Sequence, residues 1–351
     1  MIYTCLPSGN THGWGIAGTY INKELSRLRP NGVTDVSGTK SATTYDGAVL
    51  MAISGVDGLP MNPNVLSNTR MIGYGFCESP EVAAKFIDNW NKYDVVVCGS
   101  SWMRDSMARI GVRNVAVALQ GVDYDIFKPS DYNPPRNPFV VFSGGKAEYR
   151  KGTDIVIAAM AKVMKDDPEV FLYAAWGNPW PQTMRTLEKS EYIKYVHISD
   201  DWEIQMRATL IANGVPIERV LLLPIIPNEK MVEHYHQSHL GVFPNRVEAG
   251  NNMVMCEAIA SGLLVLANVS TGQWDIVGQC DSFLLEPTDT KADVKLASAI
   301  QDIKENYNKS YFAFRIARRL RLTRQACHLL IRDLISWPQC AKDLLDILEG
   351  E

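Results

Sequence analysis

Short hydrophobic runs rich in β-branched residues alternate along the chain with segments that have the periodicity of an amphipathic helix. The clearest helical segment is 153–165, where Ile155, Ala159 and Val163 fall on one stripe and Pro168 follows the end. Repeated alternation of this kind is typical of an α/β fold with parallel sheets. The predicted strands are 2–6, 47–53, 71–76, 95–98, 115–118, 139–143, 170–176, 220–223, 240–243, 263–267 and 282–285.

The pattern is interrupted once, at residues 129–138, where the sequence PSDYNPPRNP holds four prolines and can continue neither a helix nor a strand. We therefore predict two doubly wound, Rossmann-like domains, over residues 1–130 and 131–333, followed by an amphipathic helix at 334–348. In such domains ligands bind outside the carboxyl ends of the strands, so we expect a cleft between the two sheets.

Composition narrows the class of protein. Hydrophobic residues make up 46% and charged residues 21%, which is typical of a globular chain with a full core. No apolar run is long enough to span a bilayer and no secretory signal is visible, so we expect no stable membrane insertion. Seven cysteines without a CxxC pair favour reduced thiols and a cytoplasmic location. A net charge of -4 gives no general attraction to nucleic acid.

The most informative stretch is 243–267, FPNRVEAGNNMVMCEAIASGLLVLA. Its pattern predicts a strand, a glycine- and asparagine-rich loop, a helix over about 253–261 and a new strand. Backbone N–H groups at the start of such a helix are free to face an anion. Glu257, one turn into the helix, could accept hydrogen bonds from vicinal hydroxyls, and Glu248 adds a second carboxylate. The alternative is a plain strand–turn–helix with a surface glutamate and a glutamate that matches the helix dipole.

This stretch resembles the donor-site signature of glycosyltransferase family four, written EGGTNLVxMEAMACG. Ala249 replaces a glycine of the signature and Asn251 replaces a threonine. The resemblance implies a GT-B fold, in which two Rossmann-like domains face each other across a cleft. The matching residues are Glu248, Gly250, Asn252, Val254, Glu257, Ala258 and Gly262.

Other stretches follow in the family's order. FSGGKAEYRKG at 142–152 resembles the loop in which two basic residues grip the donor diphosphate, here Lys146 and Lys151. Lys146 stands where the family usually has arginine. A lysine keeps the positive charge but cannot make the bidentate contact of a guanidinium group. QGVDYDIFKP at 120–129 and VCGSSWMRDSMARIGV at 97–112 are similar to family segments around the domain boundary. The family's terminal helix crosses back to the first domain, which implies the same for the helix at about 334–351.

The resemblance also implies an activity and a site. The activity is metal-independent transfer of a sugar, with retention, from a nucleoside-diphosphate sugar to an acceptor hydroxyl, with no other cofactor. The acceptor stays open among a glycan, a lipid, a protein and a nucleic acid. The implied donor-binding residues are Gly13, Gly15, Gly145, Lys146, Lys151, Gly250, Asn251, Asn252, Met253, Val254 and Glu257. The candidate catalytic residues are Glu248, Glu78 and His12; Glu78 could equally be an N-terminal helix charge.

Two other functions compete with a transferase. Gly13, Gly15 and Gly18 spell a GxGxxG, with Asp35 further on, which is the fingerprint of an NAD(P)-dependent oxidoreductase. Six residues separate the predicted strand end from Gly13, however, whereas the fingerprint places its glycines at the turn itself. We prefer the implied role of this loop in facing the second domain near the donor. A non-catalytic protein that binds nucleotide sugars is the other alternative.

Three further patterns suggest chemistry but have simpler explanations. Residues 123–125 spell DxD, a metal-binding pattern in another glycosyltransferase fold, but they lie in the boundary turn. The histidines at 234, 236 and 239 do not share one helix face, so we predict no metal site. The arginine-rich stretch 315–332 is either a solvated helix face or a contact for a polyanionic acceptor.

Overall fold

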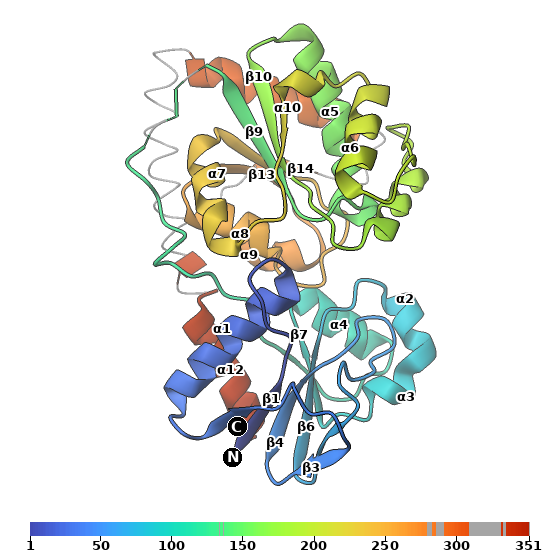
Figure 1. Ribbon diagram of the computed structural model, residues 1–351, viewed down its shortest axis with the longest axis vertical. Helices are drawn as coiled ribbons and strands as arrows, with labels where there is room; N and C mark the ends of the chain where they lie inside the picture. The colour runs from blue at the N-terminus through green and yellow to red at the C-terminus, as the bar shows by residue number, and fades with distance from the viewer. Residues whose placement is uncertain are drawn as a thin grey trace.

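The computed structural model shows an α/β protein with two lobes, one above the other in Figure 1. Each lobe contains a six-stranded sheet covered by helices, and the strands of the first lobe precede those of the second in the chain. The structure describes residues 1–132, 134–135, 137–278, 283–285, 291–308, 331–332 and 335–350.

The first lobe is built on the strand order β2-β1-β4-β6-β7-β8, and every neighbouring pair is parallel. A small parallel pair, β3 and β5, stands apart from this sheet. Helix α12 returns from the end of the chain to pack against α1, where Tyr20 and Trp337 stack with ring centroids 5.0 Å apart (Figure 1). The strands are β1 (Ile2–Cys5), β2 (Val33–Asp35), β3 (Thr43–Tyr45), β4 (Ala48–Ala52), β5 (Val65–Ser67), β6 (Arg70–Gly75), β7 (Val95–Cys98) and β8 (Val115–Val117). The helices are α1 (Gly13–Leu28), α2 (Pro80–Ala83), α3 (Ile87–Trp90), α4 (Ser101–Arg109) and α12 (Trp337–Glu349).

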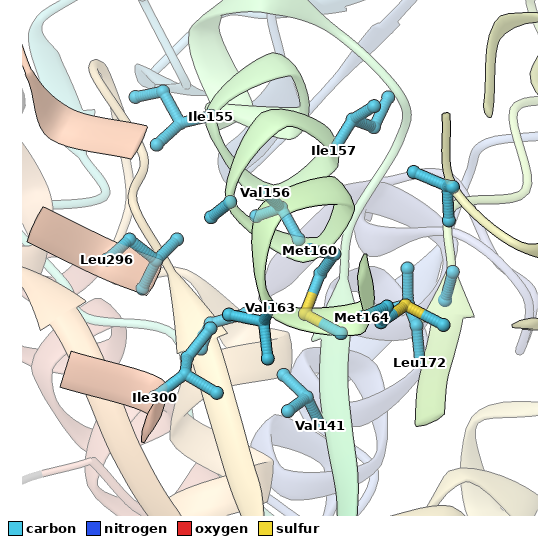
Figure 2. Close-up of a cluster of buried hydrophobic side chains, with 14 of the residues drawn as sticks. Val141, Ile155, Val156, Ile157, Met160, Val163, Met164, Leu172, Leu296 and Ile300 are labelled. Carbon is cyan, nitrogen blue, oxygen red and sulfur yellow. The ribbon is translucent and has the colours of Figure 1, made fainter. Parts of the chain in front are cut away.

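The second lobe is built on the strand order β11-β10-β9-β12-β13-β14, again parallel throughout. Its core lies where α5 covers the sheet beside α10: Val156, Met160 and Val163 pack with Val141, Leu296 and Ile300 (Figure 2). The strands are β9 (Phe139–Gly144), β10 (Val170–Ala175), β11 (Val220–Leu222), β12 (Leu240–Phe243), β13 (Leu264–Asn268) and β14 (Phe283–Leu285). The helices are α5 (Thr153–Asp166), α6 (Trp202–Ala212), α7 (Met231–Gln237), α8 (Met253–Ala260), α9 (Trp274–Val277) and α10 (Ala292–Asn308).

Strand order determines where each lobe can bind a ligand. The chain starts each sheet in the interior and reverses direction once, between β1 and β4 in the first lobe and between β9 and β12 in the second. A crevice opens at such a switch point, because the loops after the two flanking strands leave in opposite directions. The loops after these four strands are therefore the expected binding loops, two from each lobe.

Every strand predicted from the sequence is present, with ends that differ by at most one residue. The helices predicted at 153–165 and 253–261 are confirmed as α5 and α8. The terminal helix begins at Trp337, where the Ser336 hydroxyl accepts a hydrogen bond from the amide of Gln339. Strands β2, β3 and β5 were not predicted, because each has three residues and is largely unburied, so none shows a hydrophobic run. None of the helices that the structure describes is long and apolar enough to cross a membrane.

Candidate functional site

A cavity of ≈ 540 Å³ lies between the lobes and is lined by loops from both switch points. We call its lining residues before 139 the N-terminal wall and those after 139 the C-terminal wall. The structure brings most of the predicted site residues together in this one cavity. Those that line it are His12, Gly13, Glu78, Gly145, Lys146, Lys151, Glu248, Gly250, Asn252, Met253, Val254 and Glu257.

The loop after β9 carries the basic residues of the cavity. Gly152 ends it in a left-handed conformation, with φ +69°, and a Cβ there would lie 2.1 Å from the carbonyl oxygen of Pro244. Glycine is therefore needed for the loop to turn into α5. The turn brings Lys151 into an ion pair with Glu248 of the loop after β12. Burial lowers the pKa of Lys151, while Glu248 acts in the opposite direction.

Arg150 is a cavity residue that the sequence reasoning missed. Its Nε lies 2.8 Å from Glu148 and 2.9 Å from Glu78, which belongs to the other lobe, and its Nη1 lies 3.6 Å from Glu248. These carboxylates outweigh burial and raise the pKa of Arg150 above its usual range. The sequence shows a basic residue next to Lys151, but Arg150 matches no position of the family motif and was therefore not predicted.

Cations and carboxylates alternate through this part of the site. Lys146 Nζ lies 3.0 Å from Glu148 Oε1, so the three basic residues of the loop are all paired with glutamates. Burial would raise the pKa of Glu148, but Arg150 and Lys146 hold it below its usual range. For Glu78 burial prevails over Arg150, and its pKa is raised. At each of these cations, another anion can therefore take the place of the glutamate.

Helix α8 directs its N-terminus at the same loop. Asn252 begins it with φ +56°, and the Asn252 side-chain oxygen accepts from the amide of Met255 at 3.4 Å. Its side-chain nitrogen donates to Gln273 at 2.8 Å, which fixes the cap in place. Helix geometry gives the amides of Met253 and Val254 no partner inside the helix, so they are available to an anion in the cavity.

Glu257 reaches the cavity from the second turn of α8 and is 3% exposed. Its carboxylate accepts hydrogen bonds from Asn228 at 2.8 Å and from the Tyr235 hydroxyl at 3.0 Å. Burial raises the pKa of Glu257 from 4.5 to about 7, against the effect of these two hydrogen bonds. Asn228 and Tyr235 were not predicted, because they reach Glu257 from a different part of the chain.

Two predicted donor-binding residues lie elsewhere. Asn251 is fully buried outside the cavity lining, and its side-chain nitrogen donates to the carbonyl of Gln120 at 2.7 Å. Gly15 is buried within α1, against Gly9 and His12. Both residues lie outside the cavity lining, because neighbours of a lining residue on a helix or tight loop face the interior, and their role in donor binding stays a prediction.

The glycine run does not form the dinucleotide fingerprint. Gly13 begins helix α1, and Gly15 and Gly18 lie inside it, well after the end of β1 at Cys5. The preceding loop faces the second lobe as expected: the carbonyl of Asn10 accepts from the amide of Asn228 at 2.7 Å. His12 reaches across the cavity to Trp180, with the two rings edge-on and their centroids 6.1 Å apart.

The DxD turn and the three histidines lie away from the cavity lining. Residues 123–125 form a turn, in which the Asp123 carboxylate accepts from the amide of Asp125 at 3.0 Å. Within the described residues no group of three His, Cys, Asp or Glu is placed to hold a metal ion. Of the arginine-rich stretch 315–332 the structure describes only the last two residues, so the predicted face lies outside the described residues.

Comparisons with known proteins agree with this arrangement. The family model described as "Glycosyl transferases group 1" matches residues 126–318. No curated protein sequence matches the chain. Among solved structures, a sucrose-phosphate synthase from Thermosynechococcus elongatus is 15% identical, with a TM-score of 0.69 over 99% of this chain and 98% of that one.

Two further structures have the same arrangement of lobes. Anabaena Alr3699/HepE, solved in complex with UDP and glucose, is 13% identical, with a TM-score of 0.66 over 100% of this chain and 99% of that one. A UDP-forming α,α-trehalose-phosphate synthase from Burkholderia xenovorans is 13% identical, with a TM-score of 0.61 over 97% and 80% of the two chains. At these identities the likeness establishes the fold, which is GT-B.

Proposed function

This chain belongs to the group 1 glycosyl transferases, and we propose that it moves a sugar from a nucleoside diphosphate to an acceptor hydroxyl, with retention and without a metal. One observation carries the proposal. Lys146, Arg150 and Lys151 line the cavity together with the N-terminal residues of α8, at the switch point between β9 and β12. In this proposal 131–333 is the donor-binding domain, and 1–130 with the return helix is the acceptor-side domain.

The leaving group sets the main chemical demand on the site. Breaking the bond between sugar and diphosphate leaves negative charge on the phosphate and positive charge on the sugar ring. The three basic side chains and the amides of Met253 and Val254 stabilise the departing diphosphate. Because these donors are held in place before the reaction, they need no reorganisation as the charge develops. No step in this scheme requires a bound cation.

The two carboxylates of the C-terminal wall have different roles. Glu257 accepts hydrogen bonds from the ribose hydroxyls, a part of the donor that does not change during transfer. Glu248, freed from Lys151 when the diphosphate takes that lysine, binds the hydroxyls of the transferred sugar. The leaving phosphate itself takes the acceptor proton, so no strong protein base is needed. Glu78 and His12, across the cavity, help to position the acceptor.

The donor chemistry is proposed from the structural neighbours. One was solved in complex with UDP and glucose and another is a UDP-forming synthase, which makes a uridine diphosphate sugar the first donor to test. We place the reaction in the cytoplasm, in keeping with the five described cysteines, all of which are free and buried.

A ligand panel tests the proposal. UDP-, GDP- and ADP-sugars are added to the protein with and without EDTA, and the unfolding temperature is followed, with NAD and NADP as the comparison. A ligand at 100 times its dissociation constant stabilises the native state by about 2.7 kcal/mol, so one nucleotide sugar should raise the temperature by several degrees. That rise, and sugar transfer, should persist in EDTA. Stabilisation by NAD alone would overturn the transferase proposal, and donor binding without any transfer or donor hydrolysis would indicate a non-catalytic binding protein.

A further inference from the structure

The residues of the N-terminal wall of the cavity indicate the chemistry of the acceptor. Since the basic loop and α8 are assigned to the donor, the acceptor must approach over the remaining wall. This wall is formed around the loop after β4, with Gly55 and Val56, and the loop after β6, with Phe76, Glu78 and Ser79. Helix α1 adds Trp14 from the side.

Aromatic rings form the inner part of this wall. Trp14 and Phe76, both half-buried, pack edge-on with centroids 4.9 Å apart. Tyr74 supports them from below, 5.7 Å from Trp14, and its hydroxyl donates to the carbonyl of Ala118 at 3.1 Å. Two half-exposed rings on a rigid base give an apolar surface, on which the C–H face of a sugar or another apolar group can pack.

This aromatic surface adjoins the loop that holds Glu248. A Cβ on Gly250 would lie 3.1 Å from Phe76 Cε1, and a Cβ on Gly99 would lie 2.3 Å from the same atom. The Phe76 ring therefore occupies the space that these two glycines leave open. An acceptor that packs on Phe76 is thereby placed next to the transferred sugar. Outward from Phe76 the wall continues to Val56, which is 57% exposed.

Among the described residues, the lysines and arginines that line the cavity all lie on its C-terminal wall. Among the lining residues of the first lobe, all of them described, there is no lysine or arginine, and His12 is the one side chain able to carry a positive charge. The nearest cation to the acceptor side is Arg150, whose Nε already lies 2.9 Å from Glu78 and 2.8 Å from Glu148. An anionic acceptor would have to displace these glutamates while lying beside Glu78.

From this wall we infer that the acceptor is an uncharged hydroxyl compound with an apolar face, such as a neutral glycoside, and that the site discriminates against phosphorylated or carboxylated acceptors. The apolar face packs on Trp14 and Phe76, and the reacting hydroxyl points toward the loop of Glu248. Glu78 accepts a hydrogen bond from a second hydroxyl. This inference rests on the proposed transferase function.

The test uses two acceptors that differ only at C6, where one has a neutral hydroxymethyl group and the other a carboxylate. p-Nitrophenyl β-D-glucoside and p-nitrophenyl β-D-glucuronide have the same ring and the same apolar group, and only the second carries a carboxylate. Binding of each at millimolar concentration to the protein saturated with its nucleotide is measured by saturation-transfer NMR. We expect the glucoside to bind about tenfold more tightly, the effect of one unfavourable charge contact in a partly screened site.

A pair of variants shows whether the wall is responsible. Val56→Lys places a cation in the exposed lining position, and should bring the ratio of the two affinities close to one or reverse it. Leu59→Lys is the matched control: Leu59 is 44% exposed on the same loop and does not line the cavity, so the ratio should stay as in the parent.

The outcomes separate this inference from the proposed function. Equal binding of both compounds, preference for the glucuronide, or no binding of the glucoside would each overturn the inference. So would a ratio in Val56→Lys that matches the one in Leu59→Lys. Binding of the nucleotide is recorded in the same samples. If no nucleotide binds, the transferase proposal itself fails; if it binds and the glucuronide is preferred, only the inference about the acceptor fails.

Discussion

The two switch points of the molecule have the same backbone plan and opposite chemistry. In both lobes parallel strands reverse their order once, and the loops at the reversal line the shared cavity. The loops after β9 and β12 bring three cations and the N-terminus of a helix to that cavity. In the first lobe the loops after β1 and β4 bring His12 and Val56, and the neighbouring loop after β6 adds Phe76 and one carboxyl group, Glu78.

This difference shows which part of the site comes from the fold and which from the side chains. The fold supplies a crevice twice, because any doubly wound sheet opens at its switch point. The side chains in each crevice then determine which part of the reaction it serves. Charge on one wall suits a diphosphate, and the aromatic surface on the other suits a neutral acceptor.

The largest effect is expected from Glu248→Gln. If Glu248 contacts the transferred sugar as positive charge develops, the variant should turn over about 10²–10³-fold more slowly with little change in affinity for the free nucleoside diphosphate. Initial transfer rates and calorimetric binding give the two quantities. Glu148→Gln is the matched control, since Glu148 is also 5% exposed and paired in the same cluster but does not line the cavity. Equal loss of turnover in both variants would contradict the role of Glu248.

A smaller effect, on binding, is expected from Lys151→Ala. Loss of a charge-assisted contact to the diphosphate should weaken its binding by about 1.5–3 kcal/mol. The free nucleoside, which has no phosphate, should bind the variant and the parent alike. Lys162→Ala serves as control, because Lys162 lies on α5, half-exposed and paired with Asp293 away from the cavity. Diphosphate affinity that is unchanged in Lys151→Ala would remove this lysine from the donor site.

The smallest effect concerns stability and is expected from Glu257→Gln. In the folded protein the pKa of Glu257 is about 7, against 4.5 for a free glutamate, so the native state holds an extra proton between these values. Stability contributed by Glu257 is therefore lost as pH rises from about 4.5 to 7, and is constant above that range. The variant avoids this loss and should unfold with a free energy about 1–3 kcal/mol higher than the parent at pH 8, with no gain at pH 4.

Denaturant unfolding at the two pH values measures this difference, and the same variant should bind nucleotide more weakly. In the parent, nucleotide affinity should rise as pH increases through 7, since the ionised carboxylate is the stronger hydrogen-bond acceptor. A variant that is less stable than the parent at pH 8, or a parent whose nucleotide affinity is flat across pH 7, would contradict the assigned environment of Glu257.

The sequence predicted the fold closely because the buried strands are continuous hydrophobic runs between helices of clear periodicity. It missed β2, β3 and β5, whose short, half-exposed segments carry no such signal. The position of the cavity also followed from the sequence, since the family motifs lie in the loops after β9 and β12. Trp180 and Asn228 could not be assigned in the same way, because they reach the cavity from segments outside the motifs, and Arg150 was missed because it matches no position of the family motif.

Two residues of the motifs lie outside the cavity lining for a common reason. Asn251 and Gly15 stand beside cavity residues in the chain, but the backbone turns their side chains, or in glycine the Cα, toward the interior. The paired state of Lys146 and Lys151 was equally invisible, since Glu148 and Glu248 approach them only in the folded protein. A motif therefore predicts a site well, and the direction of each side chain poorly.

The central claim is that the charged wall, and not the glycine run of α1, holds the nucleoside diphosphate. Amide hydrogen exchange measured with and without UDP, or whichever diphosphate binds best, tests it most directly on the whole protein. We expect slower exchange at 145–153 and 252–257 on addition of the diphosphate, with no change at 56–60 on the N-terminal side. Protection at 13–18 with none at 145–153 or 252–257 would contradict it.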